Sequence, residues 1–248
     1  MIFHFQAVFD AAPYLAKGLV FTIELTVTAL FGGLVFGTLI AVIRQLQVPI
    51  LAKALSAYVA LLRSIPVILL LFWFFFLVPL LLAKVNNGHA VPLGPKWTAF
   101  IAFVLVEAAY YAEIVRAGLR SIERGQFEAA AALGLSIFHT YAFVIIPQVF
   151  RATSSVIVSQ TIVLFQDTSL VYVLSLTDFL GAASQIAQRD GTLTEMYVTV
   201  AVVYWLICSV GSEIAEYLKS SRTTHQKTAP LSRLKRALGI SRLQGRKP

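Results

Sequence analysis

Long runs of apolar residues, separated by polar and charged segments, dominate this chain of 248 residues. A helix that crosses the hydrocarbon core of a bilayer needs about 20 mostly apolar residues. Five segments meet that requirement: 25–43, 64–83, 97–117, 152–172 and 196–212. Because backbone polar groups cannot stay unpaired against lipid, each segment is predicted to be an α-helix. The pattern therefore predicts an all-α integral membrane protein with five transmembrane helices.

Composition agrees with a protein that faces lipid. Hydrophobic residues make up 58% of the chain and charged residues 13%, whereas soluble domains carry about a quarter charged residues. The first span has full length and no basic segment before it, so we expect it to be retained and not cleaved as a signal peptide. One cysteine excludes an internal disulfide framework. The four histidines are scattered, and we expect neither a metal site nor a cofactor.

The distribution of basic residues predicts the orientation. Loops 44–63 and 116–151, together with the segment from Lys219 onward, hold sixteen of the twenty Lys and Arg residues. Basic residues are enriched on the cytoplasmic side of bacterial membranes. These three segments are therefore predicted to be cytoplasmic, while an N-terminal segment 1–16 and loops 84–96 and 174–195 lie outside.

The net charge of +8 does not point to nucleic acid. Nine of the basic residues lie at or after Lys219, and the others mostly flank spans without interleaved aromatic residues. The tail 219–248 contains no acid. Two interpretations of it stay open: a disordered charged tail, or an amphipathic helix that lies on anionic lipid through Leu231, Leu234 and Leu238.

The third loop, 116–151, is too long for a simple connector. Its residues Glu128–Leu133 are mostly strong helix formers, and Gly125 and Gly134 bracket them. Gly134 suits the left-handed residue that ends a helix. We expect a short helix outside the membrane, whose small side chains would let a partner's cleft approach closely, although an ordinary surface helix without a partner is the alternative. Pro147 is expected to interrupt the next helix near its start.

These residues resemble a known signature. Glu128-Ala129-Ala130, three residues, Gly134, nine residues and then Val144–Pro147 resemble the EAA signature of bacterial ABC importer permeases, usually written EAA–x3–G–x9–I-x-LP. Val144 and Ile146 depart from the pattern but keep its apolar character.

Other stretches resemble the polar amino acid branch of that family. Leu62–Pro66 resembles its R-[SG]-[IT]-P segment, and Asp167–Leu170 resembles its K-D/N-T-S-L segment, although Gln166 stands where Lys is common. Residues 107–113 and 160–176 are similar to the K-type permease subunits of glutamate/aspartate importers. The resemblance covers residues 17–218 and leaves 219–248 as a separate basic tail.

The resemblance implies a type I ABC importer transmembrane domain over residues 17–218, with an EAA loop near 120–147, in the bacterial inner membrane. A second permease copy or a sister permease would complete the path, and an external binding protein would deliver an amino acid. Two cytoplasmic ATP-binding subunits would receive the EAA helices, and the residues implied in this coupling are Gly125, Glu128, Ala129, Ala130 and Gly134. The chain itself is not expected to be an enzyme, because it has no G-x-x-x-x-G-K-[ST] phosphate loop.

Polar residues at membrane depth are candidates for the substrate path. Gln160 is the leading candidate for a substrate contact, and it borders a face formed by Ser155, Ser159 and Gln166 on the fourth span. A neutral amide there suits an acidic or neutral amino acid better than a cationic one. Glu107, the deepest acid, either lines the path or holds helices together. Hydrogen bonding between helices is an alternative for the whole set.

Four local interactions are predicted. Glu113 and Arg116 stand three residues apart on one helix and should pair. Gly33 and Gly37 should permit close helix packing. Ser64 should cap the second span, next to an Arg63 that reaches the inner membrane surface. Asp167 and the two residues after it should form a cap or turn.

The leading functional interpretation is a permease subunit of an ATP-driven importer for glutamate and aspartate. The first alternative is an importer for another polar amino acid such as glutamine. A secondary transporter is a further alternative, but no convincing internal repeat is visible. A structural assembly subunit would have no need of the short cytoplasmic helix.

Overall fold

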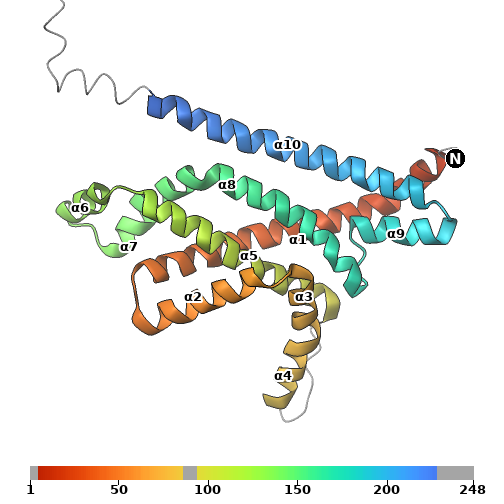
Figure 1. The fold of residues 1–248 in the computed structure, drawn as a ribbon, viewed down its shortest axis with the longest axis horizontal. Helices are drawn as coiled ribbons and strands as arrows, with labels where there is room; N and C mark the ends of the chain where they lie inside the picture. Colours follow the sequence, from red (N-terminus) through yellow and green to blue (C-terminus); the bar gives the residue numbers. More distant parts are fainter. Residues whose placement is uncertain (1–4, 86–93, 228–248) are drawn as a thin grey trace, which may run out of the picture.

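The computed structural model describes residues 5–85 and 94–227, and these residues form helices joined by short turns (Figure 1). In chain order the elements are α1 (Phe5–Gln45), α2 (Pro49–Ser64), α3 (Val67–Phe72), the π-helix η1 (Trp73–Leu77), α4 (Val78–Val85), α5 (Gly94–Ser121), α6 (Arg124–Ala132), α7 (Ile137–His139), the π-helix η2 (Thr140–Ile145), α8 (Ile146–Asp167), the 3₁₀-helix η3 (Thr168–Leu174), α9 (Phe179–Asp190) and α10 (Leu193–Lys227).

Five stretches of the described chain are long and apolar enough to cross a membrane: Gln6–Gln45, Val67–Lys84, Gly94–Ser121, Ile137–Leu174 and Leu193–Ser220. Each contains most or all of one predicted span, so the prediction of five spans is confirmed. The first helix extends much further toward the N-terminus than predicted. It begins at Phe5 and includes Pro13, so residues 5–16 belong to α1.

Two helices occupy segments that were predicted as loops. α2 begins with Pro49, a residue suited to the first turn of a helix, and buries Val59 and Leu62. α9 begins after Asp178, whose carboxylate accepts the N–H groups of Leu180 at 3.1 Å and Gly181 at 3.0 Å. Sequence reasoning missed both helices because neither is long enough to be read as a span.

The predicted cap at Ser64 is wrong, and the cap or turn predicted at Asp167 and the two residues after it is confirmed only in part. Ser64 is the last residue of α2 and not a cap of the second span, because its hydroxyl donates to the carbonyl of Ala60 at 2.6 Å. Asp167 ends α8 without a side-chain cap bond. The adjacent Thr168 does bond nearby backbone, donating to the carbonyl of Phe165 at 2.6 Å.

The centre of the fold is α5, which is the most buried of the five spans. α1 lies along it, and the two backbones come close at Gly33 and Gly37. A Cβ on Gly33 would lie 2.8 Å from the Cβ of Glu107, and one on Gly37 would lie 2.9 Å from the carbonyl oxygen of Ala108. The predicted close packing at these two glycines is therefore confirmed.

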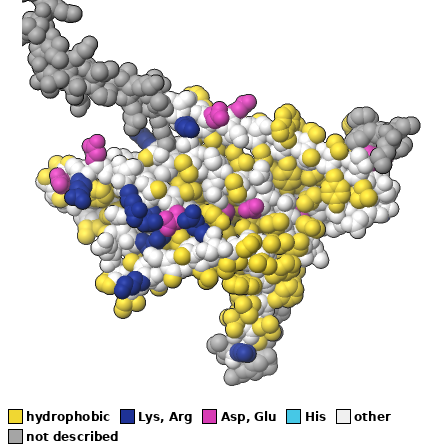
Figure 2. Space-filling view, in the orientation of Figure 1, with side chains coloured by type: hydrophobic (Ala, Val, Ile, Leu, Met, Phe, Trp, Pro, Cys, Tyr) yellow, Lys and Arg dark blue, Asp and Glu magenta, His cyan; other side chains and the backbone are white. Residues whose placement is uncertain are grey.

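The other helices surround this pair (Figure 1). α8 packs on α5, α10 lies on the outer side of α8, and α9 packs between α1 and α10 near the N-terminal end of α1. The segment α3–η1–α4 leaves the body at a steep angle, and its surface is largely apolar (Figure 2). α10 extends to Lys227, so the first residues of the predicted tail continue a helix. Leu231, Leu234 and Leu238 lie outside the described residues.

Candidate functional site

A cavity of about 330 Å³ opens between α2, α5 and α8. Its lining combines charged, aromatic, hydroxyl and amide side chains: Arg63 from α2; Tyr110, Glu113, Ile114 and Ala117 from α5; Thr153, Val156 and Gln160 from α8. α5 and α8 both belong to candidate spans. Polar side chains gathered inside spans are costly unless they line a path or bind a ligand. This cavity is therefore the candidate substrate site.

Gln160 is fixed at the cavity by Glu107. The Gln160 amide nitrogen donates to both carboxylate oxygens of Glu107, each at 3.3 Å. Glu107 is buried, and within the described residues no lysine or arginine lies at ion-pair distance from it. Because the amide N–H₂ group points toward Glu107, the amide oxygen remains as the hydrogen-bond acceptor for a ligand. The structure thus brings two of the predicted path residues together, with Glu107 behind Gln160.

Arg63 supplies the positive charge of the cavity. Its guanidinium lies 5.5 Å from the centre of the Tyr110 ring, and no carboxylate of residues 5–85 or 94–227 forms an ion pair with it. Tyr110 lies within the third span and not at its end. The expectation that Arg63 reaches the inner membrane surface stays a prediction, and α2, which packs on α5, carries Arg63 to the cavity.

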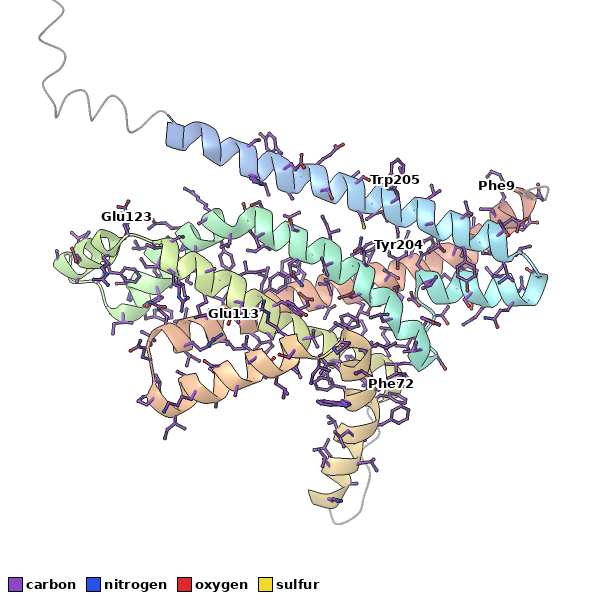
Figure 3. The ribbon with its side chains drawn as sticks, viewed as in Figure 1. Phe9, Phe72, Glu113, Glu123, Tyr204 and Trp205 are labelled. Carbon is purple, nitrogen blue, oxygen red and sulfur yellow. The ribbon has the colours of Figure 1, made fainter. Side chains whose placement is uncertain are left out.

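Glu113 lies between two arginines and faces the space between α2 and α8 (Figure 3). Its carboxylate accepts from Arg116 at 2.6 Å, which confirms the predicted pair. Sequence reasoning missed the second partner, Arg44 of α1, at 2.7 Å. Arg44 also donates to the hydroxyl of Ser56 on α2 at 3.0 Å. Two guanidinium groups on one carboxylate leave the neighbourhood of the cavity positively charged.

The remaining predicted path residues do not line this cavity. Ser159 is exposed, and its hydroxyl donates to the backbone carbonyl of Ser155 at 3.0 Å. Gln166 points toward α10, where its amide nitrogen lies 3.5 Å from the sulfur of Cys208. Each residue of an α-helix turns by about 100°, so a position six residues beyond Gln160 faces another side of α8.

A second candidate site is α6, at the end of the molecule remote from the N-terminus (Figure 1). It spans Arg124–Ala132 and confirms the predicted short helix. Gly125 lies in its first turn and does not precede it. At the other end Gly134 has φ +71°, its N–H donates to Ala131 at 2.9 Å, and the N–H of Leu135 donates to Ala130 at 3.1 Å. This pair of bonds is a Schellman motif, as predicted from Gly134.

Side chains on one face of α6 hold it to η2 and to the beginning of α8. Ala130 is buried, and the Phe127 and Tyr141 rings pack edge to face with their centres 5.9 Å apart. The amide of Gln148 donates to the amide oxygen of Gln126 at 3.2 Å. Pro147 is the second residue of α8, near its start as predicted, and a π-helical turn precedes it. A displacement of α6 would therefore be transmitted to α8.

The other face of α6 is exposed. Glu128 and Ala129 are exposed there. Large apolar side chains are exposed in the turn after α6 and in the segment that follows: Leu133, Ile137, Phe138 and Phe143, each at least 67% exposed. Small residues beside exposed apolar groups are suited to insertion into the cleft of another protein.

Comparison with known families gives one match that covers most of the chain. Residues 33–223 match the family described as binding-protein-dependent transport system inner membrane component. This range contains all of the cavity residues and all of α6.

Individual relatives agree with the family. The chain is 45% identical over 222 residues to the glutamate/aspartate import permease protein GltK of Escherichia coli O6:H1, covering 88% of this chain and 97% of that protein. It is 31% identical over 197 residues to the probable glutamine ABC transporter permease protein GlnP of Bacillus subtilis, covering 78% and 87%. Among solved structures, an amino acid ABC transporter crystallised with histidines superposes with a TM-score of 0.74 at 24% identity, covering 89% of this chain and 100% of that one.

Proposed function

The chain belongs to the binding-protein-dependent transport system inner membrane components, and from this membership we propose that it forms the path for glutamate and aspartate in an ATP-driven importer. It is a multi-pass permease subunit of an amino acid importer in the cell inner membrane, and ATP hydrolysis resides in separate subunits. The resemblance drawn from Glu128–Pro147 is thereby confirmed.

The observation that carries the substrate assignment is the pair of groups in the 330 Å³ cavity. Arg63 has no carboxylate partner in the described chain, so it is available to bind a carboxylate of the substrate through a charge-assisted hydrogen bond. Gln160 offers its amide oxygen to an ammonium group, because Glu107 holds the amide nitrogen. A cation beside a hydrogen-bond acceptor complements the carboxylate and ammonium groups of an amino acid, and the two arginines on Glu113 nearby favour one that carries an additional carboxylate.

Glutamine is the second candidate substrate, because the chain is also related to a probable glutamine permease. A side-chain amide could accept a hydrogen bond from Arg63, but without the charge. Competition for uptake between glutamate and glutamine distinguishes the two candidates.

The coupling residues and the partners belong to the same proposal. α6 is the element that an ATP-binding subunit would receive, and the residues proposed for this coupling are Gly125, Glu128, Ala129, Ala130 and Gly134. A second copy or a sister permease would complete the path and present its own helix to the second ATP-binding subunit. In Figure 2 lysine and arginine side chains gather at the end that carries α2 and α6. This asymmetry supports a cytoplasmic location for that end and an external location for the N-terminus, where the binding protein would dock.

The test of this proposal is uptake of radiolabelled glutamate into vesicles that contain the complete importer and its binding protein, with and without internal ATP. We expect uptake to require ATP. Transport driven by a proton or sodium gradient without ATP would contradict the proposal.

Variants of the cavity test the substrate assignment. Arg63→Gln is expected to lower the apparent affinity for glutamate by about tenfold or more, since hydrogen bonds to charged groups contribute about 1.5–3 kcal/mol, and to favour glutamine in competition. Gln160→Ala should weaken the binding of both substrates. Lys53→Gln, which removes an exposed charge from the same helix α2, is the matched control and should leave uptake unchanged. Unaltered affinity and selectivity in both cavity variants would remove this cavity from the path.

A further inference from the structure

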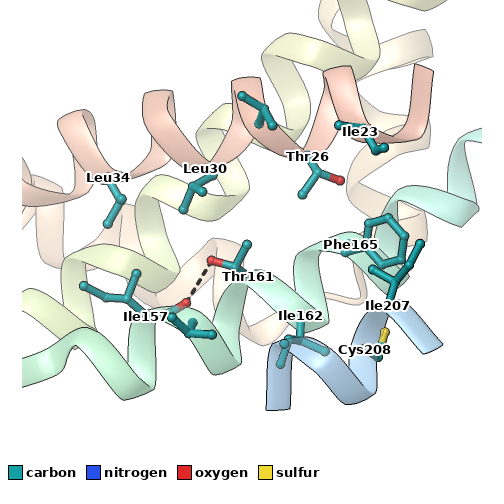
Figure 4. A pocket seen from close by; sticks show the side chains of 13 residues that line it. Ile23, Thr26, Leu30, Leu34, Ile157, Thr161, Ile162, Phe165, Ile207 and Cys208 are labelled. Atoms are coloured by element: carbon teal, nitrogen blue, oxygen red, sulfur yellow. Dashed lines mark hydrogen bonds between the residues drawn. The ribbon is translucent and has the colours of Figure 1, made fainter. Parts of the chain in front are cut away.

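A second, apolar pocket of about 530 Å³ lies on a different face of α8, where α1, α8 and α10 meet (Figure 4). Its lining comprises Ile23, Thr26, Val27, Leu30 and Leu34 of α1; Ile157, Val158, Thr161, Ile162 and Phe165 of α8; and Ile207, Cys208 and Gly211 of α10. None of the residues that line the 330 Å³ cavity contributes to it.

The few polar atoms in the pocket wall are already bonded. The hydroxyl of Thr26 donates to the carbonyl of Thr22 at 2.8 Å, and that of Thr161 donates to the carbonyl of Ile157 at 2.9 Å. The sulfur of Cys208 is in contact with the amide of Gln166. A charged amino acid or a chain of waters would find no hydrogen-bond partner here. Only an apolar molecule fits this wall.

The pocket opens onto an exposed apolar surface of the spans. All of its lining residues belong to candidate spans. The same helices α1 and α10 also carry large apolar side chains that are exposed outside the pocket lining: Val20, Phe31, Val202, Trp205 and Val210. Apolar cavities of about 150 Å³ already bind a molecule of the size of benzene, and this one is larger. We propose that one acyl chain of a membrane phospholipid occupies the pocket and packs between α1, α8 and α10.

The packing of the helices around the pocket favours an acyl chain over a helix of a second permease. α10 lies tight against α8 at Gly211, where a Cβ would come within 3.0 Å of Ile162. α10 touches α1 much less than it touches α8 and α9, so a narrow slot remains between α1 and α10.

An acyl chain at this position would support the wall of the substrate cavity from behind. Thr161 lines the apolar pocket, and its hydroxyl lies 3.0 Å from the hydroxyl of Tyr111 on α5. Gln160, the preceding residue, faces Glu107 on the same α5. The lipid therefore contacts the part of α8 that presents Gln160, and this inference goes beyond the transport function proposed above.

The proposal is tested with the complete importer in vesicles of phosphatidylethanolamine and phosphatidylglycerol that contain a phospholipid with a photoactivatable diazirine in its acyl chain. After illumination and transfer to detergent, mass spectrometry locates the label. We expect several-fold more label at Ile157–Phe165 and Ile207–Gly211 than at the exposed apolar residues Val198 and Val202.

Two pairs of variants provide the controls. Val27→Trp fills the pocket from α1 and should reduce its labelling several-fold, while Val35→Trp, at an exposed residue of the same helix outside the pocket, should not. If Val27→Trp does not fold, Ile207→Trp fills the pocket from α10, with Val210→Trp as its control. Equal labelling of the pocket and the exposed face, or labelling unaffected by the filling variants, would overturn the proposal. So would crosslinks that join Cys208 of two copies while the pocket carries no lipid label.

Discussion

At the scale of single residues, the polar groups of the spans differ in whether they have partners. Glu113 is held by Arg44 and Arg116, and Glu107 accepts from Gln160. Arg63 faces the cavity, with its guanidinium over the Tyr110 ring. Arg63 has no ion-pair partner in the described chain. Beside membrane spans, such an unpaired charge indicates a ligand site more strongly than a paired charge does.

Local pairs were predictable from the sequence, and pairs between distant residues were not. Glu113 and Arg116 stand three residues apart on one helix, so their contact follows from helical geometry alone. The contacts of Glu113 with Arg44 and of Arg63 with Tyr110 depend on how α1 and α2 pack on α5. The sequence indicated that Gln160 and Glu107 are polar residues in spans, but it could not show that they meet.

Asp178 leads to a prediction about pH. Burial raises the pKa of its carboxyl from 3.8 to about 6, although two backbone N–H groups favour the ionised form. Between these two values the folded protein keeps a proton that the unfolded chain has lost. The stabilisation is therefore fully present below pH 3.8 and is lost as the pH rises through about 6, by up to about 3 kcal/mol.

The measurement is thermal unfolding in detergent from pH 4 to pH 7. Asp178→Asn retains a residue that caps helices well but cannot titrate, so it should lose this part of the pH dependence. An unchanged pH profile in that variant would show that another group is responsible.

At the scale of elements, α6 was predicted well because its signals are local. A run of alanines forms the helix, and Gly134 ends it. α2 and α9 were missed because their evidence is tertiary: Val59 and Leu62 of α2 are buried in the same cluster as residues of α5, and α9 buries Ala182 and Ala183 in a cluster with residues of α1 and α10. An amphipathic segment next to a span does not show by itself whether it is a loop or a helix.

The glycines at the two ends of α6, Gly125 in its first turn and Gly134 just after its last, should respond in opposite ways to substitution by alanine. At Gly134, φ +71° makes alanine unfavourable by about 1 kcal/mol, so Gly134→Ala should loosen the end of α6. Gly125 is helical and has open space around it, so Gly125→Ala should stabilise the helix by about 0.5–1 kcal/mol. Hydrogen exchange of the amides from Ala129 to Leu135 measures both effects, and equal protection in the two variants would contradict this account.

The close approach of α1 and α5 gives another prediction. A Cβ on Gly37 would lie 2.9 Å from backbone atoms of both Ala108 and Ala112, and backbone atoms cannot move aside as a flexible side chain can. Gly37→Ala should therefore destabilise the fold by about 1–3 kcal/mol. Val35→Leu on the exposed side of α1 is the control. Thermal unfolding in detergent distinguishes them, and similar midpoints for both variants would contradict close packing at Gly37.

At the scale of the whole molecule, the number of spans followed from hydropathy because bilayer thickness fixes the length of a spanning helix. The placement of the helices did not follow. The cavity requires α2 to return along α5 and α8 to turn Gln160 toward Glu107, and no periodicity in the sequence encodes those choices. The orientation in the membrane is a prediction from charge alone.

Labelling of single cysteines tests that orientation. In a Cys208→Ser background, which removes the one native cysteine, Gln188→Cys on α9 should react with a membrane-impermeant maleimide in spheroplasts with an intact inner membrane. Glu123→Cys, just before α6, should react only after permeabilisation. Both positions are exposed. The reverse pattern would place α6 outside and exclude its contact with an ATPase.

The position of Arg63 at the end of α2 has a consequence for the release of substrate. Arg63 and Gln160 stand on different helices, and directly after Arg63 the chain leaves helical geometry at Ile65 and Pro66. The two halves of the proposed binding site can therefore separate at this joint while every helix stays intact. Coulomb attraction falls as charges move apart and water enters. A small opening at this joint would therefore lower the affinity of the proposed site for its substrate.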